Sequence, residues 1–565
     1  MTYDDTSSTD GDMICNLFND YFHSVFISST DTNPTNPINE LPESVDSLVD
    51  VSHIHITNSL VQKYLKQVDV NKGAGMDGVH PLLISKLSEE LAVPIAIIYQ
   101  KSMKEGSFPS IWKKALITPI PKGGNKHDVR EYRPISKLCV LGKIFEKIVT
   151  DELRRVVSRH ISEHQHGFFK GRSVETNLVL YTDYLLNSMD AGFQVDAVHT
   201  DFSKAFDKIK HSTLITKLSH LGIHGDLLRW LNSYVSNRSQ AVALKGYTSR
   251  FLMIPSGIPQ GSHLGTFLFT LYVNDIHTCF QDSSHLLYAD DTKIFRIIST
   301  PDDCLKFQTD LERFEEYCKQ DQLFLNTSKC NVISFTRKHN PIKYDYCLSS
   351  KKVTRVTEIR DLGVILDAKL QLNLHIDNII SRAYRNLGMI LRLAKPFRQP
   401  FTYKVLYYSF VRSILEFASV VWCPQYSIHI DHLERIQNKF LKSLAYRTGA
   451  SYVDRETTLQ KFNIVPLQQR RIYLDQIFLY KIINHKIDSA YLLEKINFNV
   501  PRISSRSKVT FRILPFHTNY AKNTYIRRSC RYYIEFLYDV DIFTSSLSGY
   551  RKDVCDIVFN FIPRR

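Results

Sequence analysis

The sequence lacks several features that would assign the chain to a common structural class. Its ten cysteines include no Cys-x-x-Cys pair, so neither a zinc ribbon nor a disulfide framework is indicated. No apolar run approaches the roughly 18 to 20 residues of a membrane span. The acidic N-terminus has neither the basic start nor the apolar core of a signal peptide, and no internal repeat or long basic run occurs. These absences favour an intracellular protein from a reducing compartment.

Basic residues are also absent from the first 62 positions, which hold ten acidic residues. All 72 basic residues and only 47 of the 57 acidic ones follow, so this later part carries a net charge of +25. An excess of this kind suits a polyanionic partner, although an ordinary soluble surface accounts for it equally well. The polar composition of residues 1–56 predicts an acidic lead-in that is disordered or partly ordered. One aromatic cluster interrupts it: Phe18, Tyr21, Phe22 and Phe26.

Apolar spacing divides the rest of the chain into predicted elements. A chain of 565 residues is too long for one core, so three or four subdomains of about 100 to 200 residues are expected. Mixed α and β segments change to mostly helical ones after Pro341. The predicted elements are a helix at 141–156, a strand at 195–200, a hairpin at 286–295, a strand-like run at 362–366 and a helix at 376–390.

Three aspartates lie where these predicted strands end or turn. Asp201 follows the strand at 195–200, and Asp290 and Asp291 lie at the turn of the hairpin. Two adjacent carboxylates repel each other unless a cation lies between them. Mg²⁺ prefers hard oxygen ligands, and a third carboxylate on a neighbouring strand completes a two-metal site. An Asp-Asp pair alone is more often a solvated turn, so the surrounding sequence decides the interpretation.

That surrounding sequence resembles one enzyme family. Residues 199–207 resemble motif A of reverse transcriptases, and Tyr288-Ala289-Asp290-Asp291 resembles their motif C. Residues 256–262 resemble motif B. The similarity to non-LTR (LINE-type, jockey-like) retrotransposon reverse transcriptases covers about residues 57–480. Further blocks in the family's order are residues 72–78, 112–122, 132–136, 165–173, 326–329, 362–364 and 422–441.

The resemblance implies an α+β fold of the right-hand polymerase type, with fingers, a palm built on an antiparallel sheet, a helical thumb and a helical C-terminal region. The predicted domains are 1–56 for the lead-in, 57–345 for fingers and palm, 346–450 for primer grip and thumb, and 451–565 for a basic helical C-terminal region. Jockey-like polyproteins carry an endonuclease ahead of the polymerase, and we expect that domain to be lacking here. Tyrosines among the basic residues of the last region suggest stacking on single-stranded RNA: Tyr525, Tyr532, Tyr533 and Tyr538.

The resemblance also assigns roles to individual residues. Catalysis falls to Asp201, Asp290 and Asp291, which hold metal together with the backbone carbonyl of Phe202. Phe206 lies where the family places a ring that excludes a 2′ hydroxyl, although it would equally suit a core position. Lys329 is a candidate acid for the pyrophosphate leaving group. The predicted nucleotide-binding residues are Phe206, Lys122, Arg130, Arg133, Gln260 and Lys329. The predicted template and primer contacts are Gly261, Ser262, Tyr288, Leu362 and Gly363.

The implied reaction adds deoxynucleotides to a primer 3′ hydroxyl on an RNA template. Two Mg²⁺ ions would serve as cofactors, with Mn²⁺ as an expected substitute. The implied partners are an RNA template, a DNA primer and dNTPs, with an element RNA-binding protein as a further candidate and no membrane. The family implies an intracellular location in nucleus and cytoplasm, and it leaves the oligomeric state open.

Two alternatives remain open from the sequence. The first is an inactive or repurposed element copy that binds RNA or RNA–DNA duplex without polymerising. It is favoured by His263 and Thr266, which stand where the family usually carries an aliphatic residue and a proline. The second is an RNA-dependent RNA polymerase, which shares the metal chemistry but usually has no bulky ring at the position of Phe206.

Overall fold

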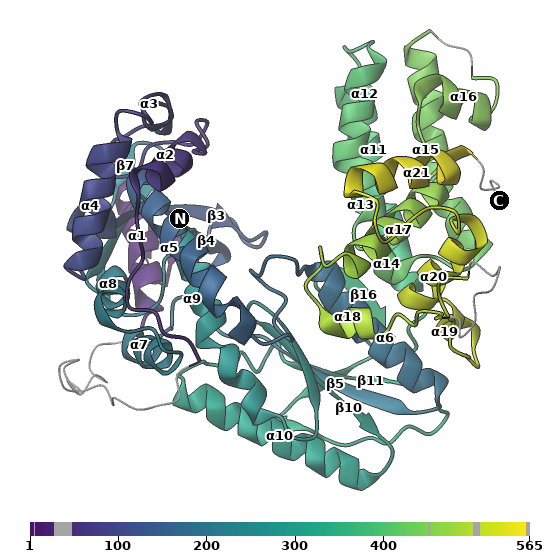
Figure 1. The fold of residues 1–565 in the computed structure, drawn as a ribbon, viewed down its shortest axis with the longest axis horizontal. Helices are drawn as coiled ribbons and strands as arrows, with labels where there is room; N and C mark the ends of the chain where they lie inside the picture. The colour runs from purple at the N-terminus through teal and green to yellow at the C-terminus, as the bar shows by residue number, and fades with distance from the viewer. Residues whose placement is uncertain (5, 28–47, 450–451, 501–508, 561–565) are drawn as a thin grey trace.

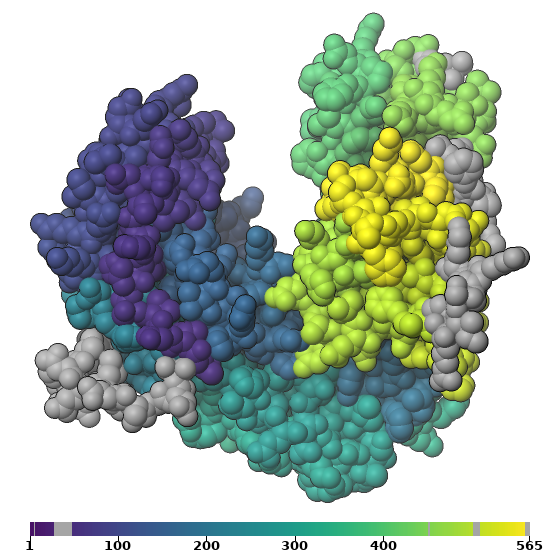
Figure 2. All heavy atoms as spheres, in the orientation of Figure 1, coloured from purple at the N-terminus to yellow at the C-terminus, as the bar shows by residue number. Residues whose placement is uncertain are grey.

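A five-stranded sheet at the base of the molecule joins two arms (Figure 1). The computed structural model describes residues 1–4, 6–27, 48–449, 452–500 and 509–560. Its mixture of helices and sheets confirms the predicted α and β composition. The space-filling view shows an open channel between the arms, with the base sheet and its helices below (Figure 2). None of the helices in these described ranges is long and apolar enough to cross a membrane.

The base sheet has the strand order β14-β11-β5-β10-β9, and only the β11–β14 pairing is parallel. The central strand, β5, is covered on both faces. Val198 packs into one hydrophobic core, and Val195 and Ala197 pack into another. Its buried polar residues are hydrogen-bonded, since Asp196 accepts from Gln194 and from the Tyr346 hydroxyl. The strands are β5 (Gln194–Thr200), β9 (Ser284–Tyr288), β10 (Asp291–Ile298), β11 (Asn331–Phe335) and β14 (Thr354–Val356); helices α6 (Val174–Asp190) and α10 (Pro301–Gln320) lie against the sheet.

The first arm is built around a second sheet and a cluster of helices. Its strand order is β4-β3-β6-β7, with β8 also paired to β6. The strands are β3 (Lys114–Pro121), β4 (Tyr132–Lys137), β6 (Arg238–Leu244), β7 (Tyr247–Thr248) and β8 (Leu252–Ile254). The helices are α2 (Asn58–Lys66), α3 (Pro81–Lys86), α4 (Ala92–Lys104), α5 (Val140–Val157), α7 (His211–His220), α8 (Gly225–Val235) and α9 (His263–Tyr272), with 3-10 turns at Ser110–Lys113, Val129–Glu131, Ser158–His160 and Asn274–Cys279.

The predicted lead-in contains an ordered helix that the sequence did not indicate. Helix α1 (Gly11–Ser24) follows the short β1 (Thr2–Tyr3) and β2 (Thr6–Ser7) and packs on β6. Phe18 and Phe22, from the aromatic cluster, are buried in the small core that it forms with the second sheet. Phe18, Tyr21 and Phe22 therefore form a packing face on one side of an amphipathic helix, whereas Phe26 lies beyond the end of that helix. Residues 28–47 of the lead-in lie outside the described residues.

The second arm is helical after a few short strands. Strands β15 (Glu358–Asp361) and β16 (Val364–Asp367) precede its helices, whereas the small hairpin of β12 (Cys347–Leu348) and β13 (Lys351–Lys352) lies against α10 of the base. The helices are α11 (Asn373–Leu393), α12 (Pro400–Tyr407), the π-helical Tyr408–Arg412, α13 (Ser413–Glu416), α14 (Ser419–Trp422), α15 (Ser427–Arg447), α16 (Arg455–Phe462), α17 (Leu467–Ile483), α18 (Ala490–Glu494), α19 (Asn519–Lys522), α20 (Tyr525–Phe536) and α21 (Leu547–Asn560).

Two sequence expectations in this arm need correction. The strand-like run at 362–366 begins with a turn, because Leu362 and Gly363 have φ values of 45° and 94° and join β15 to β16. Two of the four C-terminal tyrosines, Tyr525 and Tyr533, are 5% and 2% exposed in a hydrophobic core. These two rings are therefore unavailable for stacking on RNA. The predicted helices at 141–156 and 376–390 and the hairpin at 286–295 are confirmed.

Candidate active site

The hairpin of β9 and β10 presents Asp290 and Asp291 at its turn. Tyr288 pairs with Asp291, so Ala289 and Asp290 form a two-residue loop. Only Ala289 of these two has a positive φ, 59°, as the first position of a type II′ turn requires. Asp290 therefore lies at the tip, and Asp291 is the first residue of β10.

Asp201 lies beside this turn. Thr200 at the end of β5 pairs with Thr292 of β10, and one further step along the antiparallel register places Asp201 opposite Asp291. The backbone N–H of Asn326 donates to the Asp201 carbonyl at 2.8 Å. Phe202, whose side chain is buried, forms a β-bridge with Leu325. The fold therefore brings together the three carboxylates that the sequence predicted as a set.

A neighbouring segment holds the carboxylate hairpin in place. Gln165 accepts hydrogen bonds from the N–H groups of Ala289 and Gly167, at 3.0 and 2.8 Å. The N–H of His166 donates to the Leu287 carbonyl at 2.9 Å. A Cβ at Gly167 would lie 2.2 Å from the Ala289 nitrogen, so only glycine fits there. The sequence motif at 165–167 was recognised, but its supporting role was not predicted.

The carboxylates of the hairpin are poorly accommodated as free anions. Burial raises the pKa of Asp290, and the charge of Asp201 adds to that shift. Burial and then the charges of Asp290, Asp361 and Asp201 raise the pKa of Asp291 to about 6. Asp291 is nonetheless exposed at the surface of a cavity that it lines, so an ion from solvent can reach it. A cation at this place would remove the repulsion.

The carboxylates do not form a closed metal cage by themselves. No group of three His, Cys, Asp or Glu side chains across the described ranges is gathered closely enough to hold a metal. Mg²⁺ keeps several waters and uses one or two carboxylates with substrate phosphates, so a closed protein cage is not required. The Lys329 ammonium lies 3.0 Å from a carboxylate oxygen of Asp201 and supplies a positive charge there.

The predicted nucleotide-binding residues fall into two groups. Phe206 lies in the turn after Asp201 and stacks on Phe269 of α9, with ring centroids 4.6 Å apart. Gln260 donates to the Asp207 carboxylate at 2.8 Å, and its own carbonyl accepts from the Ser136 N–H at 2.8 Å. These contacts join residues 199–207, 256–262 and β4 into one surface.

The basic residues of β3, β4 and the turn between them do not all point to one place. The positive charge of Arg133 is within electrostatic reach of Asp290, where it partly offsets the upward pKa shift caused by burial. Lys122 donates to the Arg130 carbonyl at 3.0 Å and is within electrostatic reach of Arg133 and Lys329. The Arg130 guanidinium is instead paired with Asp128 and Asp4, at 3.3 and 3.4 Å. The structure does not bring Arg130 to the carboxylates.

The turn at 260–262 is intact despite the two departures from the family pattern. Gly261 has a φ of 116°, and a Cβ there would lie 2.9 Å from the Ser136 carbonyl. Ser262 begins α9 as its N-cap and donates to the buried carboxylate of Glu146 at 2.7 Å. His263 and Thr266 fall in the first turn of α9, where Thr266 bonds to the His263 carbonyl. Neither substitution disrupts the turn.

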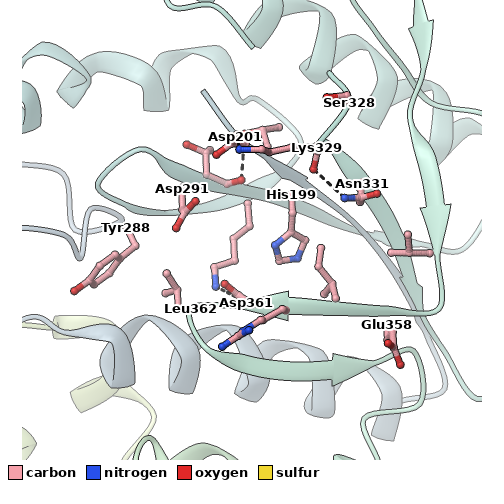
Figure 3. A pocket seen from close by; sticks show the side chains of 16 residues that line it. His199, Asp201, Tyr288, Asp291, Ser328, Lys329, Asn331, Glu358, Asp361 and Leu362 are labelled. Atoms are coloured by element: carbon pink, nitrogen blue, oxygen red, sulfur yellow. Dashed lines mark hydrogen bonds and ion pairs between the residues drawn. The ribbon is translucent and has the colours of Figure 1, made fainter. Parts of the chain in front are cut away.

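A cavity of about 520 Å³ lies beside the carboxylates (Figure 3). Asp201, Asp291 and Tyr288 line one side, and Asp361 and Leu362 line the other. A buried ion pair joins Lys293 of β10 to Asp361 of β15 at this cavity. Sequence reasoning missed both residues. Lys293 could have been identified from the sequence, because it lies two positions after Asp291 and strand alternation places both side chains on the same face.

His199 completes this face of the sheet. It pairs directly with Lys293 across β5 and β10, and its ring nitrogen lies 3.1 Å from the Tyr181 hydroxyl. Burial lowers the pKa of His199 to about 4, so the imidazole is neutral at physiological pH. Gly363, at the tip of β15–β16, approaches the Phe417 ring.

Comparison with known proteins agrees with this arrangement. Residues 120–366 match the family described as reverse transcriptase (RNA-dependent DNA polymerase). The chain is 26% identical over 411 residues to the probable RNA-directed DNA polymerase from transposon BS of Drosophila melanogaster, covering 70% of this chain and 45% of that protein. It is also 26% identical over 428 residues to the RNA-directed DNA polymerase from mobile element jockey of the same organism, covering 73% of this chain and 46% of that protein.

A third relative is the probable RNA-directed DNA polymerase from transposon X-element of Drosophila melanogaster, with 25% identity over 69% of this chain and 44% of that protein. The chain thus spans less than half the length of these relatives. The matched region contains all three aspartates and the cavity beside them. Residues 120–366 thus form a reverse transcriptase domain, and the chain is similar to RNA-directed DNA polymerases of mobile elements, which confirms the resemblance that its sequence motifs predicted.

Proposed function

We propose that the chain is an RNA-directed DNA polymerase that extends a primer 3′ hydroxyl with deoxynucleotides. The observation that carries this proposal is the strand register, which places Asp201 opposite Asp291, the chain neighbour of Asp290, at one end of the base sheet (Figure 3). The two arms leave an open channel above this sheet (Figure 2). Such a channel suits a duplex, and its base is where a primer end would meet the carboxylates. The family match over residues 120–366 supports the same reaction.

In this proposal the arms and base correspond to the parts of a right-hand polymerase. The fingers comprise about residues 57–195 with a return near 212–250, and the palm comprises 196–211 and 251–345. The primer grip and thumb comprise 346–450, followed by the C-terminal region at 451–565. The β15–β16 hairpin lies beside the cavity next to Asp291, which supports its assignment as the primer grip.

The acidic residues of the site would bind metal, and the basic residues would bind the triphosphate. Asp201 and Asp290 would hold two Mg²⁺ ions, with Asp291 and the Phe202 carbonyl as further oxygen ligands; Mn²⁺ is the expected substitute. Once bound, the ions supply positive charge that favours loss of the hydroxyl proton and departure of pyrophosphate. Arg133 and Lys122 would bind triphosphate oxygens. Lys329 would leave Asp201 when metal binds and become available to protonate the leaving group.

Other residues would define which substrate fits. The Phe206 ring, fixed by its stack on Phe269, would occupy the space of a 2′ hydroxyl. The backbone at Gln260, Gly261 and Ser262 would contact the template and the new base pair, for which glycine leaves room. Tyr288, Leu362 and Gly363 would contact the primer strand. The substrates proposed are therefore dNTPs on a primed RNA template.

A primer-extension assay tests this function. Purified protein is expected to extend oligo(dT) on poly(rA) with dTTP and Mg²⁺, and chelation of the metal should stop the reaction. Duplex binding without extension in either Mg²⁺ or Mn²⁺ would support the binding-only alternative instead. Extension with UTP at the same efficiency as with dTTP would support an RNA polymerase.

A further inference from the structure

The Lys293–Asp361 ion pair joins two parts of the proposed active site. Lys293 lies on β10, two residues after Asp291, and Asp361 immediately precedes the Leu362-Gly363 turn of β15–β16. Their side chains are only 4% and 6% exposed. Figure 3 shows Asp361 at the cavity beside Leu362, and Lys293 lines the same cavity.

The two strands have no backbone pairing that would explain their fixed relation. β10 belongs to the base sheet, whereas β15 and β16 form a separate two-stranded sheet. The backbone fixes only the root of the β15–β16 hairpin, because a single residue separates β14 from β15 and the Thr336 N–H donates to the Ala368 carbonyl at 3.0 Å. At the tip of this hairpin, side chains set its distance from the carboxylate hairpin. The ion pair is placed to do so, and it has a defined direction that apolar contacts lack.

The surroundings of the pair restrict its movement. The Lys293 ammonium lies 4.4 Å from the centroid of the Tyr181 ring, and Tyr181 in turn is within hydrogen-bonding distance of His199. His199 is the direct cross-strand neighbour of Lys293. The lysine is thus held by an aromatic ring, a neutral imidazole and one carboxylate.

Two charged groups lose favourable hydration when they are buried, and an apolar contact of the same volume does not. Such an ion pair therefore stabilises the folded state no better than an apolar contact would. A leucine or methionine at either position would pack in the same space. A role in positioning explains why an ion pair lies between the proposed metal ligands and the proposed primer grip.

We propose that Lys293 and Asp361 are positioning residues, whose ion pair aligns the β15–β16 hairpin with the carboxylate hairpin so that the primer 3′ hydroxyl meets the metal ligands. This inference rests on the proposed function. Neither residue need touch the substrate. Loss of one partner would leave the other charge buried and shift the hairpin, whereas loss of both would leave an apolar contact.

The test compares Lys293→Met, Asp361→Leu and the double variant by single-turnover extension at saturating dTTP and Mg²⁺, normalised to the folded protein. Each single variant is expected to lose about tenfold or more in rate, with duplex affinity within about threefold of wild type. The double variant should recover to within about threefold of wild type, because both charges are removed.

A matched control separates positioning from general stability. Arg528→Met breaks the Arg528–Asp475 pair in the C-terminal region, whose side chains are 2% and 1% exposed. This variant should be destabilised but should keep the wild-type rate per folded molecule. The inference would be overturned if the control lost as much rate as the single variants, or if both single variants kept the wild-type rate. Additive rate losses in the double variant would also overturn it.

Hydrogen–deuterium exchange tests the alignment role of the ion pair without relying on polymerase activity. Each single variant should speed exchange at residues 358–367, and the double variant should restore protection. If wild-type protein fails to extend any primer, the proposed function is wrong, and unchanged exchange in the single variants would independently overturn the alignment role of the pair.

Discussion

At the scale of single residues, Phe206 is the side chain whose role is most open to a quantitative test. Its ring is partly buried and stacks on Phe269, so packing and sugar selection are both compatible with its position. The residue lies in a turn before α7, and not within the following helix. A sugar-selecting ring must remain accessible on one face, and partial burial satisfies that condition.

We predict that Phe206→Val increases the use of ribonucleotides relative to deoxyribonucleotides, because the smaller side chain leaves volume for a 2′ oxygen. The ratio of the two kcat/KM values should change at least tenfold, about 1.4 kcal/mol in transition-state free energy. The matched packing control is Phe267→Leu, which changes a fully buried ring on α9, the helix that also carries Phe269. An unchanged ratio in folded Phe206→Val would show that the ring serves only the core.

The raised pKa of Asp207 should make the free energy of unfolding depend on pH. It is 8% exposed, and burial raises its pKa from 3.8 to about 6, although the Gln260 hydrogen bond opposes the shift. The unfolded state loses its proton first as pH rises. The stability of the folded state therefore falls between about pH 4 and 6 on account of this group, and is constant above that range.

Asp207→Asn removes this term and keeps an acceptor for Gln260. The variant should gain about 2 to 3 kcal/mol relative to wild type between pH 4 and pH 7.5. Denaturant unfolding at the two pH values measures the difference. A constant difference between the two proteins across this range would contradict the assignment of a raised pKa to Asp207.

At the scale of elements, the carboxylate hairpin depends on the segment that supports it. The Gln165–Gly167 region satisfies the backbone of Ala289 and Leu287 and leaves no space for a side chain at Gly167. Backbone atoms cannot move aside as a flexible side chain can. The position of Asp290 is therefore set by a segment more than 100 residues earlier in the chain.

We predict that Gly167→Ala lowers the rate of primer extension by about a hundredfold, because displacement of the turn misaligns the metal ligands. Gly549→Ala, in α21, introduces the same methyl group with only the Ser546 hydroxyl nearby and should keep wild-type activity. Near-normal extension by a folded Gly167→Ala protein would mean that the hairpin does not need this support.

The sequence predicted elements with strong periodicity but not the contacts between them. The spacing in 141–156 and the turn at Asp290 were sufficient to predict α5 and the β9–β10 hairpin. The turn at Leu362 was missed, because apolar residues in a short hairpin resemble a continuous strand. Lys293 and Asp361 were missed because their pairing joins positions 68 residues apart.

At the scale of the whole molecule, helix α6 connects the base sheet to the second arm. Leu178 packs into the core that the base sheet shares with the helices of the second arm, whereas Val179 packs into the core of the C-terminal helices. Arg172, just before α6, pairs with Asp488 at 3.2 Å. The C-terminal region is therefore anchored beside the sheet that carries the carboxylates, and this anchoring limits movement at the root of the second arm (Figure 1).

The central claim is that the three carboxylates carry metal-dependent DNA synthesis, and Asp290→Asn tests it most directly. The substitution keeps the size of the side chain at the hairpin tip but removes the charge that metal binding requires. Single-turnover extension of oligo(dT) on poly(rA) should fall below detection, as it should for Asp201→Asn, while duplex affinity stays within about threefold of wild type. Asp302→Asn, at an exposed carboxylate on α10, is the matched control and should extend normally. Extension at the wild-type rate by Asp290→Asn would contradict the account.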